Sequence, residues 1–172
     1  MHLRATNNSH MFTRIAGLPA HPLFVHLTVV IVPVAAIVAI VYVAMPRLRE
    51  RLGLASSILS AVAFVSTVVA RSAGEAMLPL MGLSEENPGA VATHADYATY
   101  LLIAVVVMTA GMISTFLIQD ARVLSKLSFL AGWRSWAVPL GMAITVNGAI
   151  ASIVTLTLTG HEGASLTWSE LS

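Results

Sequence analysis

The stretch LFVHLTVVIVPVAAIVAIVYVAM, residues 23–45, contains no Asp, Glu, Lys or Arg, and it decides the fold class. A helix needs about 20 predominantly apolar residues to cross the roughly 30 Å of hydrocarbon in a bilayer, and this stretch exceeds that length. Three further apolar runs follow it, at residues 54–80, 97–119 and 136–159. The sequence therefore predicts an all-α integral membrane protein, a four-helix bundle with four spans.

The composition favours a single membrane domain. Of the 172 residues, 57% are hydrophobic and 10% are charged, whereas an ordinary soluble domain has about 25% charged residues. The four runs leave no room for a soluble domain of useful size. We expect one domain over residues 17–172, preceded by a mobile polar tail over residues 1–16, with translation starting at Met1 or at Met11.

Several classes of protein are excluded or disfavoured by what the chain lacks. The first run is far longer than the roughly 7 to 15 apolar residues of a signal peptide, and arginines follow it where a cleavage site would be expected, so we expect a retained span. The chain has no cysteine, which excludes disulfides, thiol catalysis and Cys-ligated iron–sulphur clusters on this chain. A formal net charge of +1 gives no indication of nucleic-acid binding. We therefore expect the protein to interact with the lipid bilayer and not with nucleic acid.

The positive residues are divided unequally between the two sides of the membrane. Six lie in the connections between spans one and two and between spans three and four, and two lie on the opposite side. Cytoplasmic loops carry an excess of Lys and Arg, so we expect both termini to be extracytoplasmic. The six are Arg47, Arg49, Arg51, Arg122, Lys126 and Arg134, and the two are Arg4 and Arg14.

Small residues recur at helical spacing in two spans. Helices in a bilayer associate through close backbone approach and interhelical hydrogen bonds, which small and hydroxyl residues permit. We expect these stripes to line the bundle interior, and we expect Asn147, near the middle of span four, to form an interhelical hydrogen bond. The stripes are Ser56, Ser60, Ala63, Ser66 or Thr67, Ala70 and Gly74 in span two, and Gly141, Thr145, Gly148, Ser152, Thr155 and Thr159 in span four.

Four of the six histidines are expected near the extracytoplasmic surface, where all four spans contribute to one polar layer. Arg71 and Glu75 belong to the same layer, and their spacing of four residues lets them pair on one helix face. The four histidines are His21, His26, His94 and His161.

These histidines are candidate ligands, because neutral imidazole is the commonest metal ligand and nearby acceptors can hold its second nitrogen. Two could hold haem b, and three could hold zinc or copper. We expect His26 to face the bundle, and His21 to begin the first helix ahead of Pro22. The alternative is that amphipathic imidazoles gather at headgroup depth, with Arg71 and Glu75 as a structural ion pair.

Four short motifs carry a resemblance to a known family. HPLFVH at 21–26, RSAGEAM at 71–77, His94, and GHEGASLTW at 160–168 resemble the signature of an uncharacterised family of small bacterial membrane proteins with four predicted spans, recorded as a domain of unknown function. The resemblance implies a multi-pass protein of the bacterial cytoplasmic membrane. Some relatives are fused to Rieske-type domains, which implies electron transfer nearby. The pattern marks His21, His26, Gly74, Glu75, His94, Gly160, His161 and Gly163.

Two functions remain open. In the first, His26 with His94 or His161 ligates haem b or a transition metal in membrane electron transfer, with Arg71 and Glu75 around the site. In the second, the chain is a cofactor-free accessory or scaffold subunit that docks to a membrane-protein partner, or it forms a homo-oligomer. No HExxH, nucleophile elbow or charged path at mid-membrane depth is present, so the sequence does not decide whether the protein is an enzyme.

The distribution of positive residues generates a test of topology. A reporter that is active only outside the cytoplasm, fused after Ser172, should be active because the C-terminus is expected on the extracytoplasmic side. Activity of a cytoplasm-specific reporter alone at that position would overturn the expected orientation.

Overall fold

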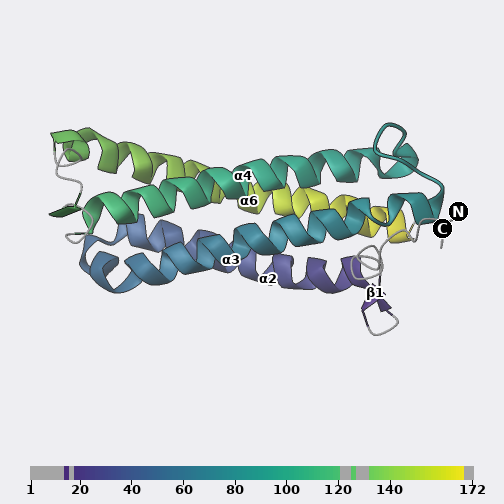
Figure 1. Ribbon diagram of the computed structural model, residues 1–172, viewed down its shortest axis with the longest axis horizontal. Coiled ribbons are helices and arrows are strands. Elements are labelled where there is room, and N and C mark those ends of the chain that lie inside the picture. The colour runs from purple at the N-terminus through teal and green to yellow at the C-terminus, as the bar shows by residue number, and fades with distance from the viewer. Residues whose placement is uncertain (1–13, 16–17, 121–124, 127–131, 169–172) are drawn as a thin grey trace, which may run out of the picture.

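A computed structural model describes residues 14–15, 18–120, 125–126 and 132–168. These residues form four long helices, which lie side by side (Figure 1). Each is long and apolar enough to cross a membrane, which confirms the all-α, four-span fold class. The helices are α2 (Ala20–Ala44), α3 (Arg49–Glu75), α4 (Ala92–Gln119) and α6 (Arg134–Trp168).

The helices pack as a closed ring in chain order, because α2 contacts α3, α3 contacts α4, α4 contacts α6 and α6 contacts α2. The start of α2 and the end of α6 lie at the same end of the bundle (Figure 1). We call this end, which contains the first turns of α2 and α4 and the last turns of α3 and α6, the histidine end. Short 3-10 turns η2 (Leu78–Met81) and η3 (Gly89–Val91) connect α3 to α4 there, and η1 (Pro46–Leu48) connects α2 to α3 at the opposite end.

The helices do not coincide with the apolar runs in the sequence. The fourth helix continues to Trp168, well beyond the run that ends at 159, and α4 begins at Ala92, ahead of the run that begins at 97. Hydropathy marks the part of a helix that contacts lipid tails, whereas the backbone hydrogen bonds continue into the polar interface. The polar tail expected over 1–16 lies outside the described residues, apart from β1 (Arg14–Ile15), which pairs antiparallel with β2 (Leu18–Pro19).

Small residues bring the helix backbones close together. An added Cβ at Gly148 would collide with the backbone nitrogen of Met108, and one at Gly111 would lie 2.8 Å from the backbone nitrogen of Thr145. Thr109 donates to the carbonyl of Ser60 at 3.0 Å, which ties α4 to α3. The interior position of most of both predicted stripes is thereby confirmed, with these members buried: Ser56, Ser60, Ala63, Ser66, Thr67, Ala70, Gly141, Thr145, Gly148 and Ser152.

The expectation for Asn147 is wrong within this chain. Its side chain is exposed, and its amide nitrogen donates to the carbonyl of Ala143 in the same helix at 2.8 Å. Gly148, the next residue, occupies the contact with α4, so Asn147 is turned about 100° away from it.

The two helix hairpins, α2–α3 and α4–α6, are related by an approximate two-fold. Adding 73 to the number of each buried α2 residue from Thr28 to Tyr42 gives a buried α4 residue in every case. Adding 89 relates α3 to α6 in the same way for Ser56, Ser60 and Ala63, which correspond to the buried Thr145, Ala149 and Ser152. The two halves therefore match along α2 and α4 and at these three positions of α3 and α6, so residues at matching positions can serve as controls for one another.

The close approach at Gly148 generates a stability prediction. The substitution Gly148→Ala should lower the free energy of unfolding by about 1 to 3 kcal/mol, because its Cβ meets backbone rather than a flexible side chain. Thermal unfolding in detergent measures the effect, with Gly160→Ala as the control because nothing lies within 4 Å of its added Cβ. Equal melting temperatures for the two variants would contradict the proposed packing.

Candidate functional site

His21, in the first turn of α2, turns toward α3. Its Nδ1 lies 2.9 Å from the backbone carbonyl oxygen of Ala70. A carbonyl oxygen only accepts, so Nδ1 of His21 donates the hydrogen bond. In the neutral imidazole this tautomer leaves Nε2 with a free lone pair.

His94, in the first turn of α4, repeats the same arrangement in the other half. Its Nδ1 lies 3.0 Å from the carbonyl oxygen of Thr159 in α6, and therefore donates to it. The 73-residue relation that connects α2 to α4 also connects His21 to His94, and the 89-residue relation connects Ala70 to Thr159. Each imidazole is therefore held by a hydrogen bond from its Nδ1 to a backbone carbonyl, at equivalent positions in the two halves.

A glycine makes room for each ring. An added Cβ at Gly74 would lie 3.0 Å from Cε1 of His21, and one at Gly163 would lie 3.1 Å from Cε1 of His94. In both halves the glycine stands four residues after the carbonyl that accepts the bond, which is about one helical turn. A side chain at either position would crowd the imidazole against its neighbour.

The two rings meet between the two halves. Their centroids are 6.3 Å apart and their planes are inclined at 85°. His21 and His94 come from α2 and α4, which lie across the ring of helices from one another. The approximate two-fold therefore brings two equivalent imidazoles together at the histidine end.

His26 and His161 lie differently. Both side chains are exposed, and Nδ1 of His26 donates to the carbonyl of Pro22 in its own helix at 2.5 Å. The expectation that His26 faces the bundle is wrong, and the inward residue is His21, which the sequence predicts both as a candidate ligand and at the start of the first helix. Five residues correspond to about 500° of helical rotation, so turning His21 inward places His26 about 140° away from it.

Arg71 and Glu75 form the expected ion pair, with Nε of Arg71 2.6 Å from Oε1 of Glu75. A second donor, Nη1 of Arg71, bonds Oγ1 of Thr99 in α4 at 3.1 Å, so the pair also joins two helices. Thr99 was not among the predicted site residues. Arg71 and Glu75 directly follow Ala70 and Gly74, whereas the equivalent positions in α6 are Gly160 and Ala164, so this ion pair has no counterpart in the other half.

The described residues contain no group of three or more His, Asp or Glu side chains that could hold a metal ion. The part of the chain that the structure describes therefore offers two neighbouring imidazoles, in edge-to-face contact, rather than a three-ligand set for zinc or copper. Arg71 and Glu75, which follow Ala70 and Gly74 on α3, bond each other, and Arg71 also bonds Thr99.

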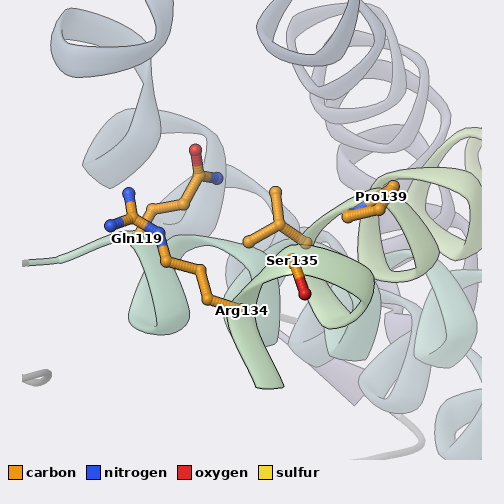
Figure 2. A pocket seen from close by; sticks show the side chains of 5 residues that line it. Gln119, Arg134, Ser135 and Pro139 are labelled. Carbon is orange, nitrogen blue, oxygen red and sulfur yellow. The ribbon is translucent and has the colours of Figure 1, made fainter. Parts of the chain in front are cut away.

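A pocket of about 470 Å³ lies at the opposite end of the bundle, between the end of α4 and the start of α6. Figure 2 shows the side chains that line it, namely Gln119, Arg134, Ser135, Val138 and Pro139. The amide of Gln119 donates to the hydroxyl of Tyr42 at 2.7 Å, so this polar group has a structural partner. The pocket contains none of the predicted site residues.

The fold and the site define a small four-helix membrane protein with two equivalent imidazoles at one end. The chain belongs to the DUF2231 family of predicted membrane proteins, which it matches over residues 17–171. Neither the curated proteins nor the solved structures contain a match.

Proposed function

We propose that His21 and His94 together bind a metal centre at the histidine end of the bundle. The centre is the iron of haem b or a single transition-metal ion, and its role is membrane electron transfer. The observation that carries the proposal is that each Nδ1 donates to a backbone carbonyl, which leaves both Nε2 atoms available as ligands.

The separation of the rings is compatible with ligation of one centre. A metal-bound imidazole nitrogen lies about 2 Å from the metal. The ring centroids of His21 and His94 are 6.3 Å apart, which is close enough for the two imidazoles to hold one centre between them. The carbonyls of Ala70 and Thr159 would act as the outer partners that orient the two histidines on a bound centre.

The number of ligands favours haem over a structural zinc ion. Zinc takes four ligands, whereas the macrocycle of haem already supplies four nitrogens to the iron and needs only axial ligands from the protein. The guanidinium of Arg71 uses Nε for Glu75 and Nη1 for Thr99, so further N–H donors remain for an anionic group on a cofactor. The Rieske-fused relatives implied by the family resemblance support a role in electron transfer by analogy.

Absorption spectra and metal analysis of purified protein test the proposal. Protein extracted into detergent from cells replete in iron and haem should show a Soret band that shifts with dithionite, or about one bound transition-metal ion per chain. His21→Gln and His94→Gln should each lower occupancy at least tenfold, because the amide can still donate to the carbonyl but offers no imidazole.

His26→Gln and His161→Gln are the matched controls, because both side chains are exposed. Their occupancy should equal that of the unsubstituted protein. A folded, colourless and metal-free protein from replete cells would contradict the proposal and would favour the cofactor-free accessory or scaffold role. Loss of the bound centre in the control variants, with retention in His21→Gln, would also contradict it.

A further inference from the structure

The two halves of the bundle present different surfaces to the membrane. On α3, Leu54, Ile58 and Val62 are exposed by 59%, 53% and 42%, at a spacing of four residues. Adding 89 to these numbers gives Ala143, Asn147 and Ala151 on α6, which are also exposed. The first face has the large apolar side chains that suit lipid tails, and the second has two small side chains and an amide.

Asn147 is the unusual member of the second face. It lies near the middle of the hydrophobic part of α6, where a polar group exposed to hydrocarbon is unfavourable. One amide N–H is used within its own helix, by the carbonyl of Ala143. A carboxamide has a second N–H and an oxygen with two lone pairs, and lipid tails offer no partner for either.

The surface beside Asn147 is hollowed. A groove of about 450 Å³ runs between α4 and α6, with the exposed side chains of Tyr100, Ile103 and Val107 on one side and Asn147, Gly148 and Ala151 on the other. Small residues on one helix let another backbone approach closely, and the larger residues across the groove provide a wall for its side chains.

We propose that this groove is an interface with a second copy of the same chain, in which α6 packs against α6 and the two Asn147 amides pair. A carboxamide is self-complementary, because each member of a two-fold pair donates one N–H and accepts one. A two-fold axis brings the same residue of both copies together, which a lipid or an unrelated apolar helix does not do. The inference is independent of metal binding at His21 and His94.

Single cysteines test the interface cleanly, since the chain has none of its own. Ala151→Cys in membranes of the expressing cell should give a cross-linked dimer with a short thiol-specific reagent. Val62→Cys, at the equivalent exposed position on α3, should remain monomeric. Equal cross-linking of both variants, no dimer from Ala151→Cys, or a product linked only to a protein of another size would overturn the proposal.

The amide is tested in the Ala151→Cys background. Asn147→Leu should lower the cross-linked fraction roughly three- to tenfold, the range expected for loss of an interhelical polar contact in a membrane. Ile58→Leu is the matched control and should leave the fraction unchanged, because Ile58 is the equivalent lipid-facing residue. An unchanged cross-linked fraction in Asn147→Leu would contradict the proposed pairing of the two Asn147 amides.

Discussion

Close approach of helix backbones is the constraint on which this structure depends. Lipid tails are as apolar as leucine, so burying apolar side chains between helices contributes little, and association relies on tight packing and interhelical hydrogen bonds. Gly111 and Gly148 bring α4 and α6 together in the middle of the bundle. At the histidine end, Gly74 and Gly163 allow a side chain to approach closely. Each leaves room for an imidazole to reach a carbonyl of the neighbouring helix.

Comparing equivalent positions of the two halves identifies the residues that both halves share and those that only one half has. Buried positions of α2 from Thr28 to Tyr42 correspond to buried positions of α4, three buried positions of α3 correspond to buried positions of α6, and the two imidazoles and the carbonyls that hold them correspond as well. The Arg71–Glu75 pair and Asn147 have no polar counterpart at the equivalent positions, which are Gly160, Ala164 and Ile58. The other half of the bundle forms without such groups, so the two-fold does not by itself require them, and the Arg71–Glu75 pair additionally joins α3 to α4 through Thr99.

Sequence reasoning predicts the features that depend on local spacing. Four spans follow from the lengths of the apolar runs, and the interior stripes follow from small residues at intervals of three and four. The Arg71–Glu75 pair follows from its spacing of one helical turn.

The orientation of α2 is harder to predict, because this helix is apolar around its whole circumference. Exposed Val30 and Ile37 and buried Val32 are equally hydrophobic in character, so the pattern does not say which side faces the bundle. For that reason the prediction that His26, rather than His21, faces the bundle is wrong. Thr99 is missed because its role depends on contact between α3 and α4, which hydropathy does not report.

The central claim is that His21 and His94 are held through Nδ1 and present Nε2 to a shared centre. Nitrogen-15 NMR of histidine-labelled, metal-free protein at about pH 8, where imidazoles are neutral, measures this directly. We predict the Nδ1–H tautomer at both residues, with signals assigned by loss in His21→Gln and in His94→Gln. The Nε2–H tautomer at either residue would contradict the account, because that nitrogen would then have no lone pair to offer a metal.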